Sequence, residues 1–272
     1  MDNMQKIPVF FTFDANYLLA AKVAIHSMMK HASRQYWYEL YVFHTTLSPK
    51  AQQSLRNSLK EFTHTELHFI DVTQYNEKIK NFGTKAHYSK EIFYKLIATD
   101  VLPQYDRIIC SDVDVVFTGD FSPVFFMFPN EKFYYAGVGP VENSRMPYYR
   151  KDFSTTEMEI LEHEIAAGFL LINLKELRND HKQEEIINFY VNNYPRLRLP
   201  EQDCIILTCW PYIKYLPIDY SLPISFYRLN MNQRDFYQGN TEFAGDKATA
   251  LAKFNKGLAH PVQIHYAGFD KP

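Results

Sequence analysis

The alternation in residues 9–43 decides the fold of this chain: it reads VFFT at 9–12, LLAAKVAIHSMM at 18–29 and LYVF at 40–43. The two four-residue runs are apolar and short, as buried strands are, whereas the segment between them has an apolar face at helical spacing. A strand, a helix and a second strand in this order predict a βαβ unit with parallel strands.

The same alternation continues toward residue 101. Ser48 and Pro49 predict the start of a helix that runs to about Glu61, because serine caps helices and proline suits a first turn. A third strand is predicted at Leu67–Ile70 and a further helix at Lys90–Val101. We therefore expect an α/β fold with ligands gathered at the carboxyl ends of its strands.

Beyond Phe121 the pattern becomes less regular and richer in aromatic residues and proline. A strand is predicted at Gly168–Leu174, a strong helix at Glu176–Asn192 and another strand at Tyr212–Leu216, while residues 225–243 show no clear period. This half is expected to be built partly from loops on the other side of the ligand crevice.

The composition excludes several classes of protein. The chain has 272 residues, 46% of them hydrophobic, which is enough for a large core, and a net charge of −2 gives no reason to expect nucleic acid as a partner. Three cysteines without a Cys-x-x-Cys pair and a polar N-terminus favour a reducing, cytoplasmic location. No apolar run approaches the roughly 18 residues of a spanning helix, so at most peripheral membrane contact is expected.

Residues 108–117 read IICSDVDVVF and place Asp112 and Asp114 at the end of an apolar strand. In extended chain, residues two apart point the same way, and two carboxylates there repel each other unless a cation compensates them. Aspartates also shape turns and cap helices. The apolar flanks favour a divalent-metal site, and Asp14, just after the first strand, falls at the same sheet edge.

Four segments together resemble glycosyltransferase family 8, over essentially the whole chain. They are FTFDANY at 11–17, SDVD at 111–114, AGFLLIN at 167–173 with EQD at 201–203, and HYAGFDKP at 265–272. The resemblance implies a single GT-A domain over residues 1–272, with a mostly parallel Rossmann-like sheet flanked by helices. Residues 1–120 would form the half that binds the nucleotide sugar, and 121–272 a loop-rich acceptor half.

The family resemblance also implies the metal and the donor. Asp112, Asp114 and His265 would bind Mn²⁺, with Mg²⁺ as an option, because carboxylates and an imidazole suit that ion. Gly268 would let the backbone approach the diphosphate, and Lys271 would stabilise the leaving UDP. In the family a tryptophan commonly follows the last proline, so its absence after Pro272 suggests a truncated chain or a short relative.

The uridine is expected against the turn that follows the first strand. Asp14 would meet the edge of the base, Asn16 the ribose and Tyr17 the face of the uracil ring. Thr12 would contribute through its backbone, and Val113 is expected beside the nucleotide. Taken alone, Asp14 can also be a helix cap.

The sugar of the donor is the least certain part of the resemblance. Lys95 would face the donor phosphates or sugar, although the family carries an arginine there, whose bidentate fork lysine lacks. The expected sugar-binding residues are Lys95, Ala167, Gly168, Glu201, Gln202 and Asp203. Ala166 replaces an asparagine of close relatives and Glu201 an aspartate. We expect galactose or glucose, with N-acetylated sugars left open.

The reaction implied is a transfer that retains the anomeric configuration, onto a hydroxyl of a bacterial surface polysaccharide, lipopolysaccharide or glycoprotein glycan. A double displacement needs a carboxylate nucleophile where this chain has Gln202, so we favour front-face substitution with Gln202 stabilising positive charge on the sugar. Asp203 would be structural or would orient the acceptor. The alternatives are a non-catalytic nucleotide-sugar-binding protein of the same fold and a haloacid-dehalogenase-type phosphohydrolase.

Overall fold

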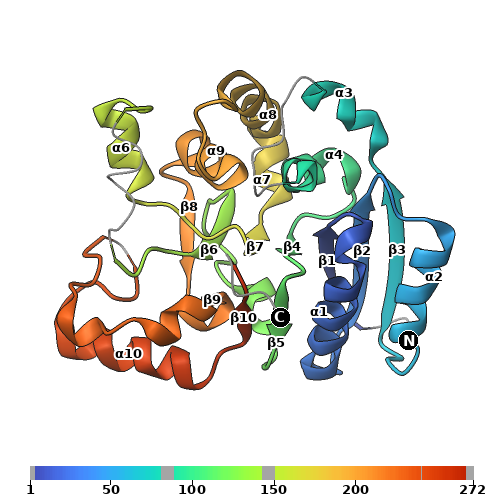
Figure 1. Cartoon of the computed structure of the whole chain (residues 1–272), viewed down its shortest axis with the longest axis horizontal. Helices are drawn as coiled ribbons and strands as arrows, with labels where there is room; N and C mark the ends of the chain where they lie inside the picture. Colours follow the sequence, from blue (N-terminus) through green and yellow to red (C-terminus); the bar gives the residue numbers. More distant parts are fainter. Residues whose placement is uncertain (1–3, 81–88, 143–150, 240, 268–272) are drawn as a thin grey trace.

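A computed structural model of the chain describes residues 4–80, 89–142, 151–239 and 241–267, and Figure 1 shows the arrangement of its elements. The large sheet contains β1 (Lys6–Thr12), β2 (Trp37–His44), β3 (Thr65–Asp71), β4 (Ile108–Ser111), β6 (Tyr135–Val138), β7 (Phe169–Ile172) and β8 (Ile213–Leu216). Its strand order is β3-β2-β1-β4-β7-β6-β8. Only β7 runs against its neighbours, so the expected mostly parallel sheet is confirmed.

A second, small sheet lies beside the end of β4. It contains β5 (Val115–Phe117), β10 (Gln263–His265) and β9 (Leu222–Pro223), in that order. β10 pairs antiparallel with β5, with His265 opposite Val115. This pairing brings residues near the C-terminus of the chain against the segment that follows β4.

The helices flank the large sheet. They are α1 (Leu18–His31), α2 (Pro49–Ser58), α3 (Asn76–Ile79), α4 (Ala98–Val101), α6 (Thr155–Leu161), α7 (Leu174–Asn179), α8 (Lys182–Asn193), α9 (Pro200–Cys209) and α10 (Lys247–Ala259). Along β1, Val9 and Phe11 pack into one hydrophobic core with α1 and α10, whereas Phe10 packs into a second core with α8 and α9. Both faces of the sheet are therefore covered, as a parallel sheet requires.

The βαβ start predicted from the sequence is confirmed. Ser48 caps α2 by accepting a hydrogen bond from the Ala51 N–H at 3.3 Å. The segment predicted as a helix at Lys90–Val101 is a 3₁₀ helix over Lys90–Ile97 followed by the single turn of α4.

The single helix predicted at Glu176–Asn192 is wrong, because two helices, α7 and α8, occupy that segment. His181 adopts the left-handed conformation with φ of 51°, which ends the regular hydrogen bonding between them. Aspartate and histidine are weak helix formers, so a break there costs little. The strand predicted at Gly168–Leu174 is shorter for a similar reason, since Asn173 caps α7 by accepting from the Glu176 N–H.

Within the described ranges, no helix is both long enough and apolar enough to cross a bilayer. The helices α6, α9 and α10 were not predicted from the sequence. Pro200 at the first position of α9, with Glu201 and Asp203 in its first turn, was the available signal for that helix.

Candidate active site at the carboxyl edge of the large sheet

Asp112 and Asp114 lie in the short segment between β4 and β5. The Asp112 N–H donates to the Gly168 carbonyl at 2.9 Å, and the Asp114 carbonyl accepts from the Tyr266 N–H at 2.9 Å. Ser111, at the end of β4, donates its hydroxyl to the Asp112 carbonyl at 2.8 Å. The backbone of the aspartate pair is thus fixed from three sides.

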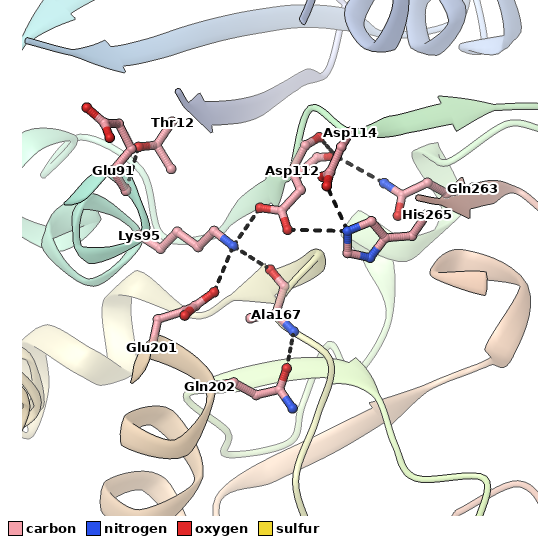
Figure 2. Close-up of polar contacts among 11 residues, drawn as sticks. Thr12, Glu91, Lys95, Asp112, Asp114, Ala167, Glu201, Gln202, Gln263 and His265 are labelled. Carbon is pink, nitrogen blue, oxygen red and sulfur yellow. Dashed lines mark hydrogen bonds and ion pairs between the residues drawn. The ribbon is translucent and has the colours of Figure 1, made fainter. Parts of the chain in front are cut away.

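His265 completes a three-residue cluster with this pair, as Figure 2 shows. Its Nε2 lies 3.6 Å from Asp112 Oδ2 and 3.3 Å from Asp114 Oδ1. One ligand atom from each residue lies within 4.8 Å of the others, so a single ion can contact all three. Two carboxylates and an imidazole are a donor set that fits Mn²⁺.

Gly168 lets His265 reach this position. A Cβ atom on Gly168 would lie 2.5 Å from His265 Cε1 and 2.6 Å from Nδ1, closer than any side chain can approach. The imidazole therefore packs directly on the Gly168 backbone. This is a reason for glycine that the sequence did not indicate, since contact with the donor sugar was expected there.

Lys95, in the 3₁₀ helix before α4, is buried against the same cluster. Its Nζ lies 2.6 Å from Asp112 Oδ1 and 3.3 Å from Glu201 Oε1, and it donates to the Ala167 carbonyl at 3.1 Å (Figure 2). Burial lowers the pKa of Lys95, but the two carboxylates outweigh it and raise that pKa above its ordinary value. A compact ammonium suits this space between two carboxylates and a carbonyl.

Glu201 is the buried carboxylate of the site. Burial raises its pKa, against the opposing attraction of Lys95. While Oε1 pairs with Lys95, Oε2 is buried and has no hydrogen-bond partner among the described residues. Leaving such an atom unpaired typically costs on the order of 1–3 kcal/mol.

Gln202 and Asp203 follow on α9 and differ in their surroundings. The Gln202 Oε1 accepts from the Ala167 N–H at 3.3 Å, and its Nε2 donates to Glu164 at 3.0 Å. Asp203 is fully buried, and its Oδ2 accepts from the backbone N–H groups of Arg198 and Leu199 at 2.6 and 2.9 Å. This geometry favours the structural role for Asp203 over contact with the acceptor.

The turn after β1 is held by its own side chains. Asp14 Oδ1 accepts from the backbone N–H groups of Asn16 and Tyr17 at 2.8 and 3.3 Å, so Asp14 acts as the cap that the sequence left open. The Thr12 hydroxyl donates to the Glu91 carbonyl at 2.6 Å. These contacts leave the expected uridine contacts untested.

Three further residues were predicted at the site, and the structure describes only Val113 among them. The Val113 side chain is buried in the core next to the aspartates, so only its backbone is available to a nucleotide. Gly268 and Lys271 lie outside the described residues, as does Pro272. Their expected roles stay predictions.

The structure adds residues that sequence reasoning missed. Gln263 is fully buried and donates from Nε2 to the Ser111 hydroxyl at 3.0 Å, which in turn supports Asp112 (Figure 2). Gln263 and His265 are two apart on β10, and this spacing was the available signal. Glu164, which accepts from Gln202, had no recognisable signal.

Comparisons with known proteins agree on the fold. A family model described as "Glycosyl transferase family 8" matches residues 8–272. A comparison with curated proteins finds no match.

Solved structures that resemble the chain include the bifunctional glycosyltransferase WbbM in its apo form, with TM-score 0.75, 20% identity, and coverage of 98% of this chain and 47% of WbbM. An active-site glutamine-to-glutamate mutant of LgtC gives 0.74 and 17%, with 98% and 89% covered. Mouse xyloside xylosyltransferase 1 gives 0.63 and 17%, with 99% of both chains covered. The chain thus spans about half the length of WbbM, and at this identity the likeness shows the fold.

Proposed function

The chain belongs to glycosyltransferase family 8, and from that premise we propose that it transfers galactose or glucose from a UDP-sugar to a hydroxyl of a glycan, with Mn²⁺ and with retention of anomeric configuration. The family assigns it to the glycosyltransferases. This assignment does not support the alternative of a haloacid-dehalogenase-type phosphohydrolase. That fold begins near the strand that carries its aspartates, whereas 111 residues precede Asp112 in this chain.

The proposal is carried by the convergence of Asp112, Asp114 and His265. These residues come from the segment after β4 and from β10, and only the β5–β10 pairing brings them together. An ion bound to them would neutralise the diphosphate as negative charge develops on the leaving UDP. Mg²⁺ would satisfy the same carboxylates less well, because an imidazole ligand favours Mn²⁺.

The donor sugar would lie over Glu201 and Gln202. The unpaired Oε2 of Glu201 offers an acceptor for a sugar hydroxyl, and Lys95 holds the other oxygen in place. A galactosyltransferase LgtC structure contains donor and acceptor sugar analogues, and another structurally similar protein is a xylosyltransferase. We propose galactose or glucose for this chain because the resemblance to the family favours these sugars, and Glu201, which is longer than the family's aspartate, would contact the sugar hydroxyls.

The proposed reaction is a front-face substitution. The bond from the anomeric carbon to the UDP oxygen breaks while the acceptor oxygen forms the new bond on the same face, and the acceptor proton passes to the leaving phosphate. Gln202 would stabilise positive charge on the sugar through its amide oxygen, which the Ala167 N–H and Glu164 contacts hold in orientation. LgtC also has a glutamine in its active site.

A screen of UDP release tests the proposal. UDP-galactose, UDP-glucose and their N-acetylated analogues are offered to the protein with Mn²⁺, with Mg²⁺ and with EDTA. We expect release from galactose or glucose donors with Mn²⁺ and none with EDTA. Ala166, in place of the family's asparagine, favours a second candidate, a non-catalytic binder; tight Mn²⁺-dependent binding of a UDP-sugar without hydrolysis or transfer would establish it.

A further inference from the structure

A hollow of about 570 Å³ lies at the carboxyl edge of the large sheet, near the end of β6. None of the residues that line it belongs to the cluster of Asp112, Asp114 and His265. Its lining includes Glu142, Glu162, His163, Asp235, Tyr237 and Gln238. β6, which ends at Val138 shortly before Glu142, runs in the same direction as β4, because both are antiparallel to β7. Ligands of such sheets gather at this edge.

The wall of the hollow is held together by ring stacking and hydrogen bonds, and it carries polar groups. The His163 ring stacks on Trp210 with centroids 3.9 Å apart, and its Nδ1 is 2.9 Å from the Tyr237 hydroxyl. Tyr215 donates its hydroxyl to the His163 carbonyl at 3.1 Å. In the described part of the chain, the His163 Nε2 makes no further hydrogen bond, so it is available to a ligand hydroxyl.

The hollow is connected to the proposed reaction centre through one short segment. Glu162 and His163 follow the C-terminal end of α6, which packs beside α9 (Figure 1). The next residue, Glu164, accepts the hydrogen bond from Gln202. On the other side, the Tyr237 N–H donates to the Val141 carbonyl at 2.8 Å, which fixes the loop to the end of β6.

Among the described residues that line the hollow, the charged side chains are the carboxylates of Glu142, Glu162 and Asp235. Glu142 is paired with Arg234 at 2.6 Å and Asp235 with Lys247 at 3.6 Å, whereas Glu162 makes no ion pair with any residue that the structure describes. Burial lowers the pKa of His163, so its imidazole is neutral near pH 7 and does not offset Glu162. An anionic ligand group there would meet an uncompensated carboxylate.

We propose that this hollow is an acceptor subsite, which binds a pyranose unit that carries no negative charge. The inference rests on the proposed transferase function and names the class of acceptor that the site selects. Carboxylate, amide, imidazole and phenol groups on a fixed wall suit the hydroxyls of a sugar. Glu162 would select against a uronic acid or a phosphorylated sugar.

The test uses three glycosides that share one ring: methyl β-glucoside, methyl β-glucosaminide and methyl β-glucuronide. The chain has two tryptophans, Trp37 and Trp210, so Trp37→Phe leaves Trp210 as a fluorescent reporter behind His163. With Mn²⁺ and UDP present, we expect the glucoside and the glucosaminide to change this fluorescence saturably, and the glucuronide to bind at least about fivefold more weakly.

The Glu162→Gln variant in the same background should reduce the discrimination against the glucuronide by about three- to fivefold. The matched control is Glu184→Gln, which removes a carboxylate from another hollow of similar size, about 540 Å³ beside α8, and should leave the discrimination unchanged. Equal binding of glucoside and glucuronide, or an unchanged preference in Glu162→Gln, would overturn the proposal. Because binding is read without turnover, a failure of UDP release, which would count against the proposed function, is seen separately.

Discussion

Asp112, Asp114 and His265 have a chemical counterpart elsewhere in the molecule. Glu39, Glu66 and His68 also present two carboxylates and an imidazole whose ligand atoms lie within 4.8 Å of one another. The counterpart lies on the neighbouring strands β2 and β3, where Glu39 is directly opposite Glu66. The same donor groups therefore occur at two places in the molecule.

Their surroundings differ in burial. Each cluster has a lysine 2.6 Å from one carboxylate, but Lys6 beside Glu39 is exposed, whereas Lys95 beside Asp112 is buried. Glu66 is exposed and His68 is partly exposed. The Asp112 cluster is joined from segments far apart in sequence, is fixed by backbone hydrogen bonds, and adjoins the buried Lys95 and the unpaired Oε2 of Glu201. The comparison teaches that suitable ligand atoms at suitable distances do not by themselves define a metal site. The backbone that carries the ligand atoms must also be fixed, and the site must be shielded from solvent.

The largest expected effect comes from removing a charge from the first cluster. Asp112→Asn should lower Mn²⁺-dependent UDP release by more than about 100-fold, because a carboxylate ligand of the ion is lost. Glu39→Gln is the matched change in the second cluster and should leave the rate and its Mn²⁺ dependence unaltered. Titrating both variants with Mn²⁺ measures this, and equal losses would remove the distinction between the clusters.

The lysines of the two clusters should differ in their effect on stability. Lys95→Met should lower the free energy of unfolding by about 3–5 kcal/mol, because it leaves buried carboxylates without their cation. Lys6→Met, at the exposed pair with Glu39, should change it little. Urea unfolding measures both. The Lys95→Met/Glu201→Gln double variant should recover part of the loss; no recovery would show that Lys95 acts through packing alone.

The smallest effect is the acid dependence of the second cluster. Burial raises the pKa of Glu39, but hydrogen bonds from Lys6 and His68 outweigh it and bring that pKa below its usual 4.5. A lowered carboxyl pKa gives stability that is present above pH 4.5 and is lost as the pH falls through the folded-state value. Glu39→Gln should therefore lose less stability than the wild type between pH 5 and pH 3 in urea unfolding. If wild type and Glu39→Gln lost the same free energy of unfolding over this pH range, the lowered pKa of Glu39 would be contradicted.

The extent to which the sequence anticipated this molecule depends on how local each feature is. The βαβ start was predictable because helical and strand periodicities report burial over a few residues. The break at His181 was not, because no glycine or proline marks it and a single left-handed histidine separates α7 from α8. Asp203 was assigned from its motif, yet its burial and its contacts with Arg198 and Leu199 depend on how α9 packs.

The sequence by itself determined the α/β class, the aspartate pair at a strand end and the family, all of which are written in short local patterns. Only the tertiary structure decided that His265 reaches Asp112 and Asp114 through the β5–β10 pairing, with room made by Gly168. It also decided that Lys95 is committed to two carboxylates and that a hollow opens beside His163. Contacts between residues more than a hundred positions apart depend on the packing of the whole chain. The hydrophobic periodicity of a short segment carries no information about that packing.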